Sequence, residues 1–326
     1  MLRQYRRTIV AGLLITVIAL GVAAGAQLSY GAYDRLTSVP ADCGGGYEGS
    51  TPASFKAGID TAPFLMPDYS EVRFPSRDPG IAIDAWWVPG PSLDAPAVVL
   101  AHGLGECKRA TSVLLPAGML HSHGYAVLVI DLRDEGSSTV DNGRFAGGAG
   151  EACDILGGWD WLRNEKGIPA PRIGLFGISL GAGAAILAMG QEPKVAATWE
   201  DSGYADLVQT LRYQESARGL QPVLVDLGVA VSRLLGTHLA TRPVDALDDL
   251  AGRPIALVSG NADRLVPLEQ AQQLIDAARA HGNPTVWIVP GVGHTGAMGN
   301  DPAEYERRLL AFFDGSLGGT GSTLSG

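Results

Sequence analysis

From Ala97 onward, short apolar runs alternate with longer stretches of helical pattern, and this alternation constrains the fold more than any other feature. The apolar runs lack a polar residue at every second position, as expected for strands covered on both faces of a parallel sheet. We expect strands at residues 98–100, 126–130, 173–176, 195–197, 255–258 and 286–289. Crossover helices are expected near residues 108–123, 151–164, 180–190, 268–281 and 302–314. The alternation predicts an α/β fold with a mostly parallel, doubly wound sheet.

Two segments depart from this alternation. Residues 71–74 and 81–88 alternate apolar with polar positions around a turn, which predicts an N-terminal antiparallel hairpin. Residues 203–250 have an amphipathic helical pattern and no expected strand, so we expect a helical cap inserted over the carboxyl edge of the sheet. The core then comprises residues 71–202 and 251–314, with a linker or lead-in at 31–70 and a flexible tail at 315–326.

The N-terminus, residues 1–30, is predicted to be a signal anchor or a signal peptide. Arg3, Arg6 and Arg7 precede an uncharged run over residues 8–33, which is long enough to span a bilayer as a helix. The arginines favour a cytoplasmic N-terminus, which would place the rest of the chain outside the cytoplasm, anchored in the cell membrane. Residues 24–26 also fit a small-residue cleavage site, so secretion after signal-peptide cleavage is the alternative.

The charge of the chain argues against nucleic-acid binding, whereas its cysteines leave the disulfide pairing undetermined. The net charge is −10, and no run rich in lysine and arginine follows the first seven residues. Nucleic-acid binding needs a basic face that displaces counterions, so we expect no nucleic-acid partner. Three cysteines, Cys43, Cys107 and Cys153, would allow one disulfide in an oxidising compartment, but their spacing does not choose the pair.

The expected strand at residues 173–176 runs into Gly177-Ile178-Ser179-Leu180-Gly181, after which a helix begins. A strand that breaks at such a turn before a helix is typical of a nucleophile elbow, which lifts the serine hydroxyl clear of the sheet. Glycines flank the serine because a Cβ there would collide with neighbouring backbone. Ser179 is therefore the candidate nucleophile, and it needs a general base and a group that orients the base.

The remaining catalytic groups can be placed by their position after the expected strands. His294 is the candidate base, because it follows the last strand on a glycine-containing loop. Asp263, after the penultimate strand, is the favoured acid, and Asp201, after the strand before it, is the alternative. The backbone N–H groups of Leu104 and Leu180 are the candidate donors of an oxyanion hole.

These motifs, in this order, resemble the α/β-hydrolase family over roughly residues 71–315. The features that carry the resemblance are Ala101-His102-Gly103-Leu104-Gly105, the Gly-Ile-Ser-Leu-Gly turn, the Asp263 turn and Gly293-His294-Thr295. The chain looks most similar to exported or membrane-anchored bacterial hydrolases, through Trp86-Trp87-Val88-Pro89, Asp131-Leu132-Arg133 and Gly150-Glu151. Those relatives usually have Arg-Gly-His-Gly-x-Ser where this chain has Arg133-Asp134-Glu135-Gly136-Ser137. We expect these two acids to lie near the mouth of the site and to shift substrate preference.

The resemblance implies hydrolysis of a carboxylic ester of a small-molecule acyl substrate through an acyl-enzyme, with no metal or organic cofactor. An exopeptidase or amidase and an acyltransferase are alternatives on the same residues. A non-catalytic binding protein of the cell envelope is the competing hypothesis, because a fold alone does not establish chemistry. If the cap forms an acyl pocket, we expect activity to depend on the chain length of the ester.

Overall fold

The computed structural model describes residues 2–40, 43 and 46–318. Within this part of the chain, eight strands form one sheet in the order β1-β2-β4-β3-β5-β6-β7-β8. The strands are β1 (Ser70–Pro75), β2 (Ala82–Val88), β3 (Ala97–Ala101), β4 (Ala126–Ile130), β5 (Ile173–Ile178), β6 (Ala197–Asp201), β7 (Ile255–Gly260) and β8 (Thr285–Val289). β1 pairs with β2 and β2 with β4 in antiparallel fashion, and all other neighbours are parallel. The predicted mostly parallel sheet with an N-terminal antiparallel hairpin is confirmed.

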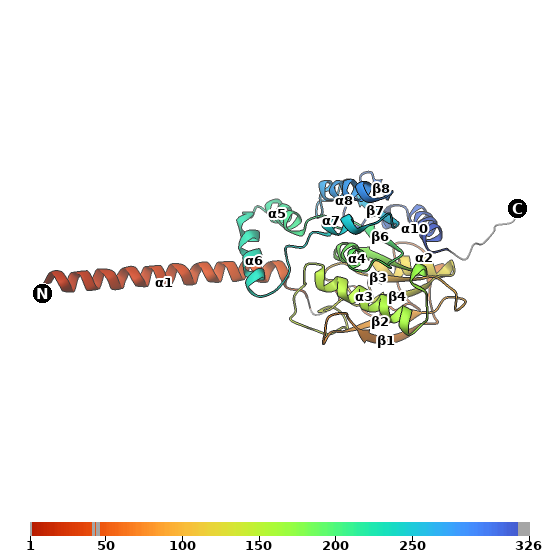
Figure 1. Cartoon of the computed structure of the whole chain (residues 1–326), viewed down its shortest axis with the longest axis horizontal. Helices are drawn as coiled ribbons and strands as arrows, with labels where there is room; N and C mark the ends of the chain where they lie inside the picture. Colours follow the sequence, from red (N-terminus) through yellow and green to blue (C-terminus); the bar gives the residue numbers. More distant parts are fainter. Residues whose placement is uncertain (1, 41–42, 44–45, 319–326) are drawn as a thin grey trace.

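Helices cover both faces of the sheet, as a doubly wound fold requires (Figure 1). The apolar side chains of α3 (Ala149–Asn164), α4 (Leu180–Gln191) and α8 (Leu268–His281) pack in one buried cluster. Those of α2 (Thr111–Ser122), α9 (Ala297–Asn300) and α10 (Pro302–Leu317) pack in a second. Short 3₁₀ turns occur at Ala62–Phe64 and Ala170–Arg172. β3, β4 and β5 are buried along their whole length between these two layers, which explains their uniformly apolar sequences.

The position of β6 differs from the prediction. The sequence predicts a strand at residues 195–197, whereas β6 begins at Ala197 and ends at Asp201. All five residues are buried, including the acids Glu200 and Asp201. Burial raises the pKa of Glu200 to about 8, and the carboxyl group accepts a hydrogen bond from the Gly203 N–H. An apolar pattern could not locate this strand because its second half consists of buried polar side chains.

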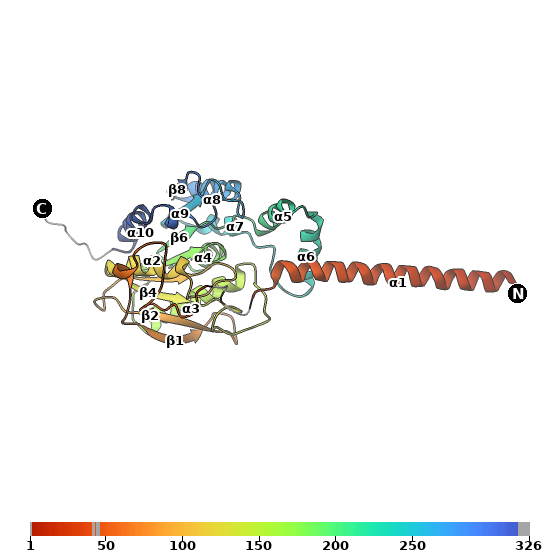
Figure 2. The same ribbon diagram turned by 180° about the vertical axis from the view of Figure 1, so that it is seen from behind.

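Between β6 and β7 the chain forms α5 (Leu207–Ala217), α6 (Val223–Leu234), α7 (Pro243–Ala246) and a 3₁₀ turn at Leu247–Asp249. α5 and α6 lie beside the end of α1 (Leu2–Thr37), which projects away from the rest of the molecule (Figures 1 and 2). A lead-in beginning at residue 31 was predicted, but α1 continues through residues 31–37. Tertiary packing explains this extension of the helix, because Ala32 and Tyr33 are buried against α6, where Gly228 allows the two helices to approach closely.

Most of α1 is exposed and apolar. Ile9–Thr37 is long and apolar enough to cross a membrane, and the apolar part of a signal sequence meets the same criterion. The chain therefore carries an N-terminal helix compatible with an anchor or a signal.

The last helix of the described chain, α10, extends into the predicted C-terminal tail. The predicted tail began at residue 315, but α10 continues to Leu317, whose side chain is buried against Phe313 and Gly174. The rest of the predicted tail, from residue 319, lies outside the described residues.

Cys43 and Cys107 form a disulfide, which joins the segment after α1 to the loop after β3, and Cys153 is a free thiol.

Candidate active site

Ser179 occupies a strained turn between β5 and α4. Its backbone has φ of 55° and ψ of −114°, a region that a non-glycine residue rarely adopts. A Cβ on Gly177 would lie 2.1 Å from the carbonyl oxygen of Gly181, and one on Gly181 would lie 2.4 Å from that of Ala101. Both contacts are with backbone that cannot move aside. The two glycines of the motif are therefore required by the sharpness of the turn.

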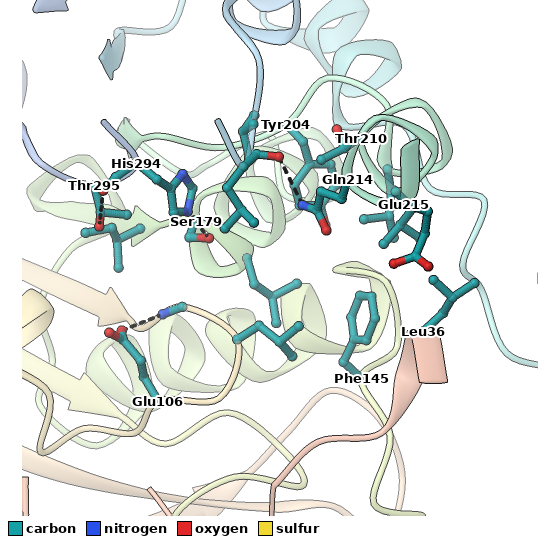
Figure 3. A pocket seen from close by; sticks show the side chains of 18 of the residues that line it. Leu36, Glu106, Phe145, Ser179, Tyr204, Thr210, Gln214, Glu215, His294 and Thr295 are labelled. Carbon is teal, nitrogen blue, oxygen red and sulfur yellow. Dashed lines mark hydrogen bonds between the residues drawn. The ribbon is translucent and has the colours of Figure 1, made fainter. Parts of the chain in front are cut away.

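The structure brings Ser179, His294 and Asp263 into one hydrogen-bonded chain. His294 Nε2 lies 2.9 Å from Ser179 Oγ (Figure 3). His294 Nδ1 lies 2.7 Å from Asp263 Oδ2. The carboxyl group of Asp263 is fully buried, whereas 18% of the His294 side chain is exposed. The three residues follow β5, β8 and β7, so the carboxyl ends of three parallel strands bring them together.

Asp263 is held so that one of its oxygens faces the imidazole. The other oxygen, Oδ1, accepts hydrogen bonds from the N–H groups of Leu265 at 2.7 Å and Val266 at 2.9 Å. The alternative acid, Asp201, is directed elsewhere: it accepts hydrogen bonds from the hydroxyls of Tyr305 and Ser202, each at 2.8 Å. Of the two acids considered from the sequence, Asp263 is the one bonded to His294.

Ser202 has a positioning contact that the sequence did not reveal. Its hydroxyl donates to Asp201 and accepts a hydrogen bond from the Thr295 N–H at 3.1 Å. Thr295, which follows His294, has a positive φ of 53°, and Ser202 has one of 60°. The residue after β6 thus fixes the histidine loop through a partly buried hydrogen bond between two residues with positive φ. No motif marks this serine, because the contact forms only when two distant loops meet.

The two candidate oxyanion donors come from the loop after β3 and from the start of α4. The amides flanking Leu104 are fixed by carboxyl groups, since Gly103 N–H donates to Glu106 at 3.2 Å and Gly105 N–H donates to Glu135. Leu180 is the first residue of α4, so its N–H has no acceptor within the helix and lies at the positive end of the helix dipole. Leu104 and Leu180 line the same cavity as Ser179 and His294.

Asp134 and Glu135 do not line this cavity, contrary to the expectation that they lie at its mouth. Asp134 is buried, and its Oδ1 accepts hydrogen bonds from the backbone N–H groups of residues 141, 142 and 143. Glu135 is buried behind the Leu104 loop, and burial raises its pKa to about 9. Both acids therefore accept hydrogen bonds from the backbone of neighbouring loops. The difference from the relatives' Arg-Gly-His-Gly-x-Ser sequence thus has a structural role at these positions.

The cavity in front of Ser179 has a volume of about 610 Å³ (Figure 3). Its lining mixes apolar and polar side chains, and its walls include α5, the loop before α3 and the end of α1. The lining includes Leu36, Phe145, Ile178, Tyr204, Leu207, Leu211 and Val266. Arg35, Leu36 and Ser38 also belong to it, so residues at the end of the N-terminal helix form part of the site wall. No sequence pattern predicts that contribution.

The fold and the geometry around Ser179 define an α/β-hydrolase of the serine hydrolase class. The chain belongs to the prolyl oligopeptidase family, whose model matches residues 116–320. A Pyrococcus furiosus esterase has a similar structure, with a TM-score of 0.64 and 21% identity, covering 83% of this chain and 100% of the esterase. An acylaminoacyl peptidase from Pyrococcus horikoshii is similar with a TM-score of 0.58 and 18% identity, covering 76% of this chain and 41% of the peptidase.

Two sequence relatives are named as uncharacterized proteins. One, from Mycobacterium tuberculosis, is 26% identical over 254 residues, which are 77% of this chain and 80% of the relative. The other, a 31.7 kDa protein encoded in the traX-finO intergenic region of Escherichia coli, is 32% identical over 129 residues, or 39% of this chain and 43% of that protein. Family membership thus defines a serine hydrolase, either an esterase or a peptidase, and the substrate has to be argued from the site.

Proposed function

We propose that this protein is a carboxylic-ester hydrolase that acts through Ser179, His294 and Asp263. The observation that carries the proposal is the hydrogen-bonded chain from Asp263 to Ser179, which opens into a cavity of about 610 Å³ lined in part by apolar side chains. A cavity of this size and character suits the acyl part of an ester. The proposed catalytic domain lies outside the cytoplasm, with α1 as its membrane anchor.

In the proposed reaction, Ser179 Oγ attacks the acyl carbon while His294 Nε2 removes the hydroxyl proton. Asp263 keeps the proton on Nδ1 and stabilises the imidazolium that forms. The N–H groups of Leu104 and Leu180 stabilise the developing oxyanion. His294 then gives its proton to the leaving alkoxide, and a water molecule, activated by the same imidazole, hydrolyses the acyl-enzyme.

The polar contacts of the cavity favour an ester over a peptide with a free amino terminus. Such a peptide needs a carboxylate available to bind its ammonium group. Glu215 is instead paired with Arg35 at 3.2 Å and Arg218 at 2.6 Å. Glu106 accepts hydrogen bonds from Gly103 N–H and from Ser112 Oγ at 2.7 Å. Both carboxylates of the cavity are therefore engaged by groups of the protein itself.

The Cys43–Cys107 disulfide supports the proposed location, because such cross-links persist in oxidising compartments outside the cytoplasm. It joins the segment that leaves α1 to the loop that follows Leu104. In the anchored arrangement, the disulfide and α1 together hold the N-terminal segment against the site.

The proposal is tested by comparing kcat/KM of the purified full-length protein on 4-nitrophenyl butyrate and on alanine 4-nitroanilide. We expect ester hydrolysis that is abolished in Ser179→Ala and an anilide rate lower by orders of magnitude. A higher kcat/KM on the anilide would establish the exopeptidase alternative. A folded wild-type protein that hydrolyses neither compound would favour the non-catalytic alternative.

A further inference from the structure

A second cavity, of about 430 Å³, lies between α1 and α6, next to the cavity that contains Ser179. We call it the α1–α6 groove. Its lining is apolar apart from Gln27, Arg35 and Glu215, and it consists of Ala24, Gln27, Leu28, Gly31, Ala32, Arg35, Leu36, Glu215, Leu224 and Val225. Arg35, Leu36 and Glu215 line both cavities, so the groove and the site adjoin at the end of α1.

We propose that the α1–α6 groove binds the long acyl chain of a membrane-resident ester and leads its carbonyl group to Ser179. The inference rests on the proposed esterase function and on the anchoring of α1, and it specifies the class of substrate. The ligand is an amphiphile with one long hydrocarbon chain attached through an ester bond, taken from the outer face of the membrane.

The position of the groove along α1 agrees with entry from the bilayer. A hydrocarbon layer of about 30 Å is crossed by about 20 helical residues. Counted from Ile9, where the apolar span begins, those residues end near Leu28. The groove extends along α1 from Ala24 to Leu36, which is about 18 Å at 1.5 Å per residue. Its first turn therefore lies at the edge of the hydrocarbon layer, and its far end meets the site.

The other wall of the groove is suited to a membrane surface. α6 lies crosswise to α1 in both views, so a membrane-spanning α1 would place α6 along the membrane plane (Figures 1 and 2). Val225, Gly228 and Val229 are buried on one face of α6. Large apolar side chains at its two ends are exposed instead: Val223 by 54% and Leu234 by 86%. An amphipathic helix with such exposed ends is typical of the lipid–water interface.

The charged residues lie where the two cavities meet. Glu215 is buried and paired with the half-exposed side chains of Arg35 and Arg218. The pairing avoids an isolated buried carboxylate, which would be costly beside an apolar groove. Leu36 lines both cavities, so the acyl chain of the ligand can pass from one cavity to the other along an apolar side chain. The polar junction lies at the end of the active-site cavity away from Ser179 (Figure 3), and the apolar groove continues from it.

Gly31 allows the groove to be blocked without disturbing its walls. It lines the groove, and a Cβ built on it meets no atom within 4 Å. The Cβ of Gly31→Phe therefore meets no neighbouring atom, and its ring extends from a position that lines the groove. Gly25→Phe is the matched control, because Gly25 lies in the same helix, also has no atom within 4 Å and does not line the groove. Six residues separate the two positions, which places them on different faces of α1.

The experiment measures kcat/KM of the full-length wild type and both variants in mixed micelles of phosphatidylcholine and a nonionic detergent. The substrates are 4-nitrophenyl palmitate and 4-nitrophenyl acetate. We expect Gly31→Phe to lose at least tenfold on the palmitate ester and to keep its activity on the acetate ester. Gly25→Phe should match the wild type on both.

Equal effects of Gly31→Phe on both esters, or no effect on either, would overturn the role of the groove. A wild type that hydrolyses acetate but not palmitate would also overturn it, while leaving the proposed esterase function intact. A folded wild type that hydrolyses neither ester would contradict the proposed function itself. The two failures are therefore distinguishable.

Discussion

Replacing Asp263 with asparagine should remove most of the activity while leaving the fold intact. Oδ1 of Asp263 accepts two backbone N–H groups, from Leu265 and Val266. An asparagine must present its carbonyl oxygen to these donors, so its NH₂ group must face His294. The imidazole can accept that hydrogen bond only if Nδ1 is unprotonated, which moves the neutral ring's proton to Nε2. His294 would then donate to Ser179 and could no longer remove its proton.

The size of the loss follows from this change of tautomer. Forcing a triad histidine into the wrong tautomer costs about 10⁴-fold in kcat. At 1.36 kcal/mol per factor of ten, that loss corresponds to about 5.4 kcal/mol of activation free energy. Asp201→Asn is the matched control, because the Asp201 carboxyl group is not hydrogen-bonded to His294 and contacts the histidine loop through Ser202 and Thr295. A displacement of the loop by about 1 Å would cost about 10²-fold.

The assay is the hydrolysis of 4-nitrophenyl butyrate at saturating substrate, with far-UV circular dichroism and the melting temperature as checks on folding. We expect Asp263→Asn to keep the wild-type spectrum and to lose about two orders of magnitude more activity than Asp201→Asn. If Asp263→Asn stays within tenfold of the wild type, or if Asp201→Asn loses more, the assignment of the acid is wrong.

Three further predictions concern stability. Gly228→Leu should lower the free energy of unfolding by roughly 1–3 kcal/mol, because its Cβ would lie 2.7 Å from Leu36 Cδ1 and 3.3 Å from the backbone of Ala32. Chemical denaturation measures this loss. An equal loss in Ala230→Leu, on the exposed face of α6, would show that the α1–α6 contact is not its cause. Glu135→Gln should make stability less dependent on pH. Burial raises the pKa of Glu135 in the folded state to about 9 from 4.5, so the wild type loses stability as pH rises between these values. The melting temperature of the variant should therefore exceed that of the wild type by a margin that grows from pH 5 to pH 8. A constant margin would show that the carboxyl group is not the source. Cys43→Ser should lower the free energy of unfolding by about 4 kcal/mol, since the disulfide closes a loop with a sequence separation of 64; equal denaturation midpoints for the wild type with and without reductant would show that the bond contributes no stability.

The central strands could be predicted from sequence because burial on both faces imposes a purely apolar composition. β4 was predicted with the bounds that the structure shows, at residues 126–130. β6 was misplaced because Glu200 and Asp201 are buried acids, and hydrophobicity alone cannot indicate a buried carboxyl group. The end of α1 was missed for a different reason: residues 31–37 stay helical through packing against α6, a contact between segments nearly 200 residues apart.

The residues of the candidate site could be predicted where chain order and strand position determine them. Ser179, Asp263 and His294 each follow a strand, and parallel strands bring their carboxyl ends to one edge. Ser202 could not be found in this way, and Glu135 was wrongly expected at the mouth of the site, because each acts through a neighbouring loop whose path depends on the complete fold. The contribution of Leu36 to the cavity was missed because an apolar N-terminal segment is normally excluded from fold prediction.

The central claim is that Ser179 is an activated nucleophile, and a fluorophosphonate probe tests it directly. The purified wild type should be labelled with a stoichiometry near one, on a peptide that contains Ser179, and labelling should be lost in Ser179→Ala and strongly slowed in His294→Ala. Absence of labelling in a folded wild type, or labelling that persists in Ser179→Ala, would contradict the account.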